Sequence, residues 1–354
     1  MYWSRLIKLL NNKETIIEMP GFVKVCLILL FLLFISGCNN TLTGNVVNSQ
    51  EHSESGIQTE IYFCPVDDCG KIVTNLIDDA KKSVHCAFYD LDLKDLIKTL
   101  GKKSHNADVK IVIEGSNYEG NIKGPGIKIA KASQYMHNKF CVLDNNKVLT
   151  GSMNPTNNGA NLNNNNLIIV NSGYLAENYE DEFDELWNGL YASGDNVKYR
   201  EINTNIGLIE NYFCPEDCQE GENSMLNLVR KANKSVKVAI FSFTHEDLGD
   251  ELVKADIRGL DISVLVERRQ RNVQKSQYTR LKDFDIGIKV DGNKYNMHHK
   301  FIIIDDKIVI TGSPNFSYSG YNRNDENFLI IYNENLALEF VNEFDMLFGN
   351  GEIV

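Results

Sequence analysis

The chain has 354 residues, 43% of them hydrophobic, which fits a globular protein of two domains or one duplicated domain. It has 36 Lys and Arg against 48 Asp and Glu, giving a formal net charge of -12. This charge excludes wholesale attraction to nucleic acid or to an anionic lipid surface, so any anion site must be a local basic pocket.

A short apolar run lies near the N-terminus. Residues 23–35 are almost all aliphatic or aromatic, and Ser36-Gly37-Cys38 follows them. The run is shorter than the roughly 20 residues of a membrane span and is typical of a signal peptide. Its end resembles a lipobox, so we expect residues 1–38 to be a signal segment with Cys38 lipidated, or alternatively an uncleaved anchor. Both interpretations predict an extracytoplasmic, membrane-anchored protein.

Residues 39–56 are rich in Asn, Ser, Thr, Gly and Glu and contain few large apolar side chains. This composition predicts a flexible tether. We place two domains after it, at residues 57–200 and 201–354.

These two domains are an internal duplication. The segment Tyr-Phe-Cys-Pro at residues 62–65 recurs at 212–215, and Met-His-x-Lys-Phe at 136–140 recurs at 297–301. A repeat of this length predicts two copies of one structural unit.

Each copy has the same predicted order of elements: strand, helix, strand, loop, hairpin, strand and helix. The β-branched runs 109–113 and 262–266 are predicted strands, and Asp-rich turns at 144–147 and 305–307 each connect two strands. We therefore expect an α/β fold of two sandwiches related by a pseudo-twofold axis.

Six cysteines follow Cys38. Two pairs, Cys64 with Cys69 and Cys214 with Cys218, occupy the same loop of each copy. In an exported protein they predict two small disulfide loops; a shared four-thiolate zinc site is the alternative. The other two, Cys86 and Cys141, lie in apolar strands and are interpreted as buried free thiols.

Each copy also contains a histidine and a lysine two residues apart in a predicted strand, so the two side chains share one face. They are His137 with Lys139, and His298 with Lys300; an aspartate follows each lysine after four residues, and then Gly-Ser-x-Asn. This pattern resembles the H-x-K-x4-D motif of the phospholipase D superfamily over residues 57–350. The resemblance implies tandem α-β-α sandwich domains and a metal-independent phosphodiesterase without cofactors, which works through a covalent phosphohistidine.

Phosphodiester cleavage needs a nucleophile, an acid for the leaving alkoxide and positive charge around the phosphate oxygens. One histidine is expected to attack while the other protonates the leaving group. Both lysines are expected to hold the phosphate, together with four polar residues: Asn154, Asn315, Ser152 and Ser313.

Three other polar residues near the motifs are predicted to have no chemical role. Asp144 and Asp305 are at an odd spacing from the histidines and at a turn, so we expect them to stabilise the hairpins. His299 has the opposite parity to His298 and should be packed or on the surface.

The copies differ after Gly-Ser-x-Asn. A carboxylate in this region orients the histidine in the family, and Glu326 supplies one where the first copy has Asn165. We expect Glu326 to pair with His298 and favour its acid role, and Asn165 to leave His137 neutral and nucleophilic. A decayed first site is the competing explanation.

The substrate remains open, because one fold hosts many functions. A basic stretch, Arg268, Arg269, Arg271, Lys275, Arg280 and Lys282, is interpreted either as a phosphate-binding border of the cleft or as a solvated face with ion pairs. Membrane tethering favours a phospholipid substrate. The alternatives are a nuclease and a non-catalytic anion-binding module. A monomer is expected to suffice, since both motifs lie in one chain.

Overall fold

The computed structural model describes residues 52–354, which belong to one compact unit, Glu51–Val354. The predicted leader, Cys38 and residues 39–51 lie outside the described residues. None of the helices in the described part is long and apolar enough to cross a membrane.

The first copy forms a seven-stranded sheet with the order β2-β8-β7-β6-β3-β4-β5. The described chain begins with β1 (His52–Glu54). The elements of the first copy follow: β2 (Gln58–Cys64), α4 (Cys69–Asp79), β3 (Ser83–Phe88), α5 (Lys94–Lys103), β4 (Asp108–Glu114), β5 (Ile127–Ala130), β6 (Lys139–Leu143), β7 (Lys147–Gly151), α6 (Asn157–Asn161), β8 (Asn165–Asn171) and α7 (Gly173–Asn188).

The second copy repeats this order in a nine-stranded sheet, β1-β9-β10-β16-β15-β14-β11-β12-β13. Its elements are β9 (Glu201–Thr204), β10 (Gly207–Cys214), α8 (Cys218–Lys231), β11 (Ser235–Ile240), α9 (Glu246–Ile257), β12 (Asp261–Val266), α10 (Tyr278–Asp283), β13 (Gly287–Val290), β14 (Lys300–Ile304), β15 (Ile308–Gly312), α11 (Tyr318–Asn322), β16 (Glu326–Tyr332) and α12 (Glu334–Gly349).

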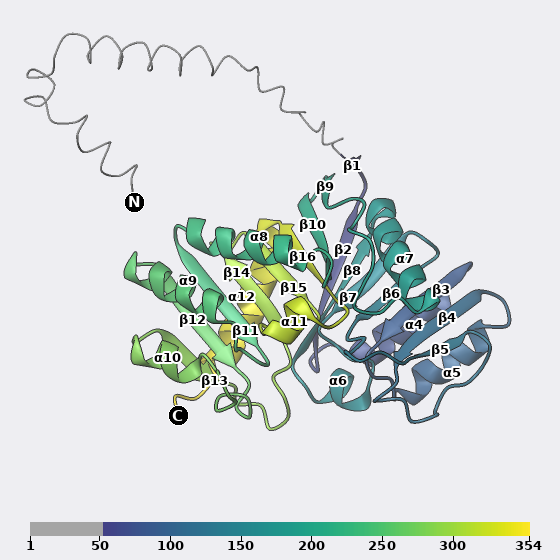
Figure 1. Ribbon diagram of the computed structural model, residues 1–354, viewed down its shortest axis with the longest axis horizontal. Coiled ribbons are helices and arrows are strands. Elements are labelled where there is room, and N and C mark those ends of the chain that lie inside the picture. Colours follow the sequence, from purple (N-terminus) through teal and green to yellow (C-terminus); the bar gives the residue numbers. More distant parts are fainter. Residues whose placement is uncertain (1–51) are drawn as a thin grey trace, which may run out of the picture. The chain divides into compact units, whose positions relative to one another are not determined.

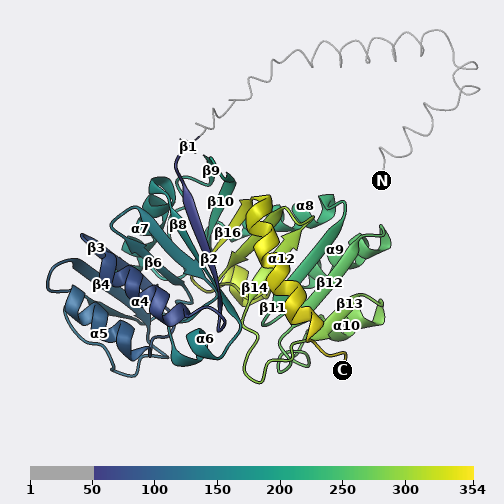
Figure 2. The same cartoon turned by 180° about the vertical axis from the view of Figure 1, so that it is seen from behind.

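The duplication is therefore confirmed strand by strand. From β10 to β13, every strand of the second sheet has the position of the first-sheet strand eight lower in number. Figure 1 shows the two sheets side by side, and Figure 2 shows α4 over the first sheet and α12 over the second. The expected tandem α/β architecture is correct.

The predicted tether extends too far into the folded region. β1 (His52–Glu54) pairs in parallel with β9 and so belongs to the sheet of the second copy. The Glu54 carboxylate also accepts hydrogen bonds from the Ser172 hydroxyl and the Gly173 amide at the start of α7. Composition indicated a linker, but pairing with the edge of a sheet and capping of a helix order these residues.

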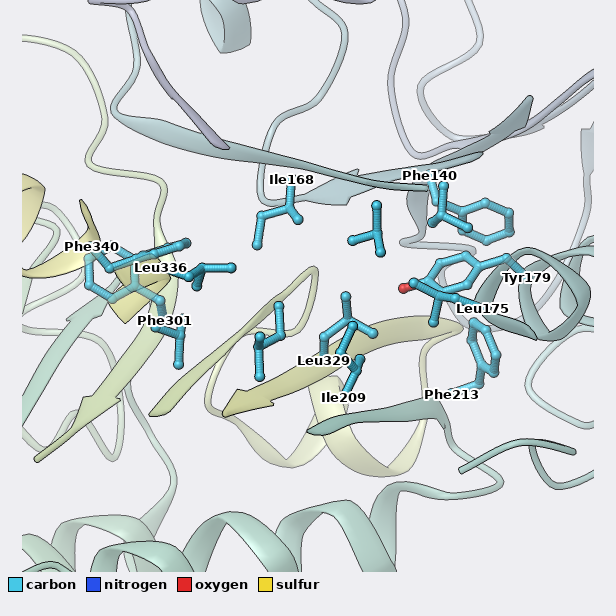
Figure 3. Close-up of a cluster of buried hydrophobic side chains, with 14 of the residues drawn as sticks. Phe140, Ile168, Leu175, Tyr179, Ile209, Phe213, Phe301, Leu329, Leu336 and Phe340 are labelled. Atoms are coloured by element: carbon cyan, nitrogen blue, oxygen red, sulfur yellow. The ribbon is translucent and has the colours of Figure 1, made fainter. Parts of the chain in front are cut away.

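The core between the two sheets is shared by both copies. Phe140 and Tyr179 from the first copy and Phe213, Phe301 and Leu329 from the second belong to one buried cluster. Their side chains point toward a common interior in Figure 3. A shared apolar core of this kind fixes the two motif-bearing strands relative to each other.

The six cysteines among residues 52–354 form three disulfides. Cys64–Cys69 and Cys214–Cys218 close the two small loops as predicted, in place of a zinc site. The interpretation of Cys86 and Cys141 as free thiols is wrong, because they face each other across β3 and β6 and form a third disulfide.

Candidate active site

The two motifs meet at the interface between the copies. His137 lies just before β6 and His298 just before β14, and each is held by the opposite copy. The His137 amide donates to the Asp325 carbonyl (2.9 Å), and the His298 amide donates to the Asn164 carbonyl (2.8 Å). The chain segments carrying the histidines are thus fixed across the interface.

Reciprocal side-chain bonds define the pseudo-twofold axis. The Thr150 hydroxyl donates to Asn327 Oδ1 (2.6 Å), and the equivalent contact joins Asn166 Nδ2 to the Thr311 hydroxyl (2.9 Å). All four side chains are buried and lie beside the motif strands. Because such buried polar groups need their partners, the two copies are locked in one register.

The axis also decides which residue orients which histidine, and the expected pairing is wrong. Glu326 contacts the first histidine: its oxygens lie 2.8 and 2.7 Å from His137 Nδ1. Asn165 Oδ1 lies 2.9 Å from His298 Nδ1. Equivalent segments cross the axis, so each orienting residue serves the histidine of the other copy.

The two serines also differ from their expected role as phosphate ligands. Ser313 Oγ donates to Glu326 (2.5 Å), and Ser152 Oγ donates to Asn165 Oδ1 (3.0 Å). Both serines are completely buried. They position the acceptors that orient the histidines and do not face the substrate.

Lys139 and Lys300 begin their strands as buried side chains, 3% and 1% exposed. Each ammonium donates to the carbonyl of the preceding histidine, at 2.5 Å for Lys139 and 2.8 Å for Lys300. Burial lowers the pKa of Lys139 to about 7 and that of Lys300 well below its ordinary value, where the charge of Lys139 adds to the effect. An anionic phosphate bound between the lysines would raise the pKa of both ammonium groups again.

The histidines are also held in their neutral forms. Burial lowers the pKa of His137 to about 4, although the Glu326 carboxylate favours the protonated ring. Burial and the charges of Lys300 and Lys139 lower the pKa of His298 well below its ordinary value. Burial also opposes ionisation of Glu326, but the contact with His137 holds the pKa of this carboxyl below its usual range. Only one histidine therefore has a carboxylate beside it.

Asn154 and Asn315 are predicted to bind the phosphate, and their side chains are available for it. The carboxamide oxygen of each is buried and has no hydrogen-bond partner among residues 52–354. Each follows the Gly-Ser-x turn at the end of β7 or β15. Their amide nitrogens are suitable donors to phosphate oxygens.

Two aromatic residues of the site were missed by the sequence analysis. The Tyr89 ring lies edge-on to His137 (centroids 4.4 Å apart), and Phe241 lies edge-on to His298 (4.9 Å). The lysine ammoniums lie over the same rings, at 5.0 Å for Tyr89 and 5.5 Å for Phe241. Both copies have an aromatic residue directly after the equivalent strands β3 and β11, and this repeated position in the sequence could have identified the two rings as site residues.

The remaining motif residues have structural contacts, as expected. Asp144 accepts from the backbone amides of residues 81–83, and Asp305 accepts from those of residues 233–235. Each aspartate therefore fixes the start of a neighbouring strand. His299 is fully buried, with Nε2 3.1 Å from Glu343.

The basic stretch divides into two groups. Three of its six members form ion pairs: Arg268 with Glu352, Lys275 with Glu246, and Arg280 with Asp250. Lys282 donates to the Val354 carbonyl (2.7 Å). Arg269 and Arg271 instead bond to uncharged oxygens of Asn296 and Arg268. The interpretation as an ion-paired face therefore holds for part of the stretch only.

Within residues 52–354, no group of three or more His, Cys, Asp or Glu side chains is arranged to hold a metal ion. The groups that converge at the interface are two imidazoles, two ammoniums and the Glu326 carboxylate, and the Asn154 and Asn315 carboxamides follow the strands paired with β6 and β14. Together they provide a nucleophile, a proton donor and charge for a phosphate.

Comparison with known proteins assigns this arrangement to a family. Residues 73–187 and 225–348 both match the family described as cardiolipin synthase, PLD-like domain. The chain therefore belongs to the phospholipase D-like family. The phosphatidylserine synthase structure from Haemophilus influenzae Rd KW20 has a TM-score of 0.63 at 12% identity, over 83% of this chain and 87% of that one, and so shares the fold.

Curated relatives match over shorter regions. The mouse protein named mitochondrial cardiolipin hydrolase is 30% identical over 137 residues, 38% of this chain and 62% of the relative. The Rickettsia prowazekii protein named phospholipase D is 31% identical over 113 residues, 32% of this chain and 55% of the relative. The chain thus spans between half and two thirds of the length of these relatives.

Proposed function

We propose that the chain is a phosphodiesterase that hydrolyses phospholipids through a covalent phosphohistidine, without a metal ion. One observation carries the proposal: Nδ1 of each histidine is engaged by an acceptor from the opposite copy. This fixes the tautomer with Nε2 as the reactive nitrogen on both rings. Two imidazoles oriented in this way beside two buried lysines suit attack on phosphorus and protonation of a leaving group.

The carboxylate beside His137 decides between the two roles. During attack the nucleophilic ring changes from neutral to cationic, whereas the acid changes from cationic to neutral. A fixed carboxylate stabilises the first change and opposes the second. We therefore retain His137 as the nucleophile, for the opposite reason to the one expected from sequence.

In the first step, His137 Nε2 forms a bond to phosphorus as the bond to the alcohol oxygen breaks. His298 gives its proton to that oxygen, and the anionic phosphodiester favours the protonated ring beforehand. In the second step, neutral His298 takes a proton from water, the hydroxide adds to phosphorus and the bond to His137 breaks. The products are an alcohol and a phosphomonoester.

Phospholipid is proposed as the substrate because the curated relatives are named cardiolipin hydrolase and phospholipase D. A nucleic-acid phosphodiester is the alternative, supported by Arg269 and Arg271, which have uncharged partners. The three disulfides support export to an oxidising compartment, where the predicted N-terminal segment would anchor the protein to a membrane.

The test uses the compact unit of residues 51–354, which contains the three hydrophobic cores and all three disulfides of the described residues. Labelled cardiolipin, phosphatidylcholine, single-stranded DNA and RNA are offered in parallel, with EDTA present. We expect release of an alcohol from phospholipid, and its loss in His298→Ala. If only nucleic acid were hydrolysed, the substrate would be a nucleic-acid phosphodiester and the lipid proposal would be wrong. Loss of turnover with EDTA would contradict the metal-free mechanism.

A further inference from the structure

Two exposed tyrosines flank the chain segments that carry the catalytic histidines. Tyr135 is 50% exposed and Tyr295 is 40% exposed, and each precedes its histidine by two or three residues. The Tyr135 carbonyl accepts from the Asp325 amide (3.0 Å), which holds this segment at the pseudo-twofold interface. Both rings therefore lie at the catalytic interface and are partly open to solvent.

Tyr135 is connected to the nucleophile by ring contacts. Its centroid lies 5.7 Å from that of Tyr89, which lies 4.4 Å from that of His137. A path of aromatic rings thus leads from the buried imidazole to the surface. Such rings have an apolar body and a polar tip, which suits the boundary between lipid and water.

Positive charge accompanies the tyrosine of the second copy. Lys294 is exposed and its ammonium lies 5.9 Å from the Tyr295 ring. Arg269 is also exposed; it donates to Asn296 Oδ1 (2.5 Å) and to the Lys294 carbonyl (3.5 Å). In the described part of the chain, neither cation forms an ion pair with a carboxylate, so both charges are available to an anionic partner.

We propose that Tyr135, Tyr295, Arg269 and Lys294 form a docking rim that seats the catalytic unit on an anionic phospholipid membrane. The proposal rests on the proposed lipid substrate. The chain has a net charge of -12, so an anionic membrane repels most of its surface. A local rim of rings and cations therefore seats the catalytic unit and turns the histidines toward the lipid, which an N-terminal anchor alone does not do.

The test compares vesicle binding with catalysis on a soluble ester, using residues 51–354. The variants are Tyr135→Ser with Tyr295→Ser, and Lys294→Gln. The control is Leu338→Ser, an equally exposed apolar residue (49%) on α12. Binding is measured by sedimentation with vesicles of phosphatidylcholine alone or with added phosphatidylglycerol, and catalysis with bis(p-nitrophenyl) phosphate.

We expect wild type and Leu338→Ser to bind the anionic vesicles, and the double tyrosine variant to bind about tenfold more weakly, since two ring contacts with lipid are lost. Lys294→Gln should weaken binding to anionic vesicles only. Hydrolysis of the soluble ester should stay within about twofold, because no rim substitution touches the reacting atoms.

Equal vesicle binding by wild type and the double variant would overturn the proposal, as would a preference of the wild type for neutral vesicles. Sedimentation measures binding without turnover. A protein that binds vesicles through the rim but hydrolyses no substrate would therefore contradict the proposed function and leave the docking proposal standing. If single-stranded DNA, and not vesicles, bound through the same side chains, the rim would be a nucleic-acid surface and the membrane proposal would be wrong.

Discussion

The two copies of the duplication share their backbone architecture but differ in charge beside the histidines. The ring of His137 is held by a carboxylate, at 2.7 Å from Glu326, whereas that of His298 is held by a carboxamide, at 2.9 Å from Asn165. Both acceptors are fully buried and each is fixed by a serine. In the proposed mechanism this difference makes the reaction asymmetric, because only the His137 ring has a carboxylate to stabilise its cationic form during attack.

The largest effects should follow removal of either histidine. With a phospholipid, His137→Ala and His298→Ala should each lower kcat by about 10⁴-fold or more. The two variants should differ with bis(p-nitrophenyl) phosphate, because its leaving group departs without a proton. His298→Ala should then release one burst of p-nitrophenol and stall, because it still forms the phosphoenzyme. A burst from His137→Ala instead would reverse the assigned roles.

Exchange of the acceptors sharpens the comparison. Glu326→Gln removes the charge that stabilises the cationic ring and should lower kcat by about 10²-fold. Asn165→Asp places a carboxylate beside His298, raises the pKa of that ring and should slow proton donation by roughly tenfold. The pH profile of Asn165→Asp should shift upward, because its acid stays protonated to higher pH. Equal effects of both substitutions would argue for a merely structural role.

The lysines give a pH dependence. Lys139, with its pKa lowered to about 7 by burial, is protonated below that pH and loses its charge above it. The kcat/KM for an anionic substrate should therefore fall as the pH rises through about 7. In Lys139→Arg the fall should move to higher pH, since a guanidinium stays charged. An unchanged profile in this variant would mean that another group controls the descending limb.

The copies also differ in their strands. Where the first copy has the Cys86–Cys141 disulfide, the second has the apolar pair Val238 and Ile302. Replacing Cys86 by Val and Cys141 by Ile should lower the free energy of unfolding by about 2–4 kcal/mol. Without the disulfide, the unfolded chain is no longer restricted by a closed loop and gains conformational entropy. Urea unfolding without reductant measures the change. If reductant lowers the stability of wild type by more than that of the variant, which keeps the other two disulfides, the Cys86–Cys141 disulfide is the cause.

Most of the fold and the four central site residues could be predicted from the sequence, because repeats and local spacing carry that information. The role of the hairpin aspartates also followed from turn chemistry. Strand parity indicated that His299 faces away from the site, packed or on the surface, and the structure shows that it is buried. Contacts across the pseudo-twofold axis did not. Glu326 is 28 residues after His298 in the same copy, and only the packed interface shows that it reaches His137 instead.

Two other errors arose from tertiary contacts. Cys86 and Cys141 are separated by 55 residues, and their pairing depends on the register of β3 with β6. Both positions lose their cysteine together in the second copy, a paired difference that was a usable signal. β1 was missed because three polar residues have little strand character alone and are ordered by the edge of β9.

Locating the covalent phosphate tests the division of labour most directly. Residues 51–354 are mixed with ³²P-labelled substrate and quenched in alkali, and the peptides carrying His137 and His298 are separated by mass spectrometry. We expect the phosphate on His137, and its yield to fall in Glu326→Gln. Phosphate on His298 would contradict the claim that the ring beside the carboxylate is the nucleophile.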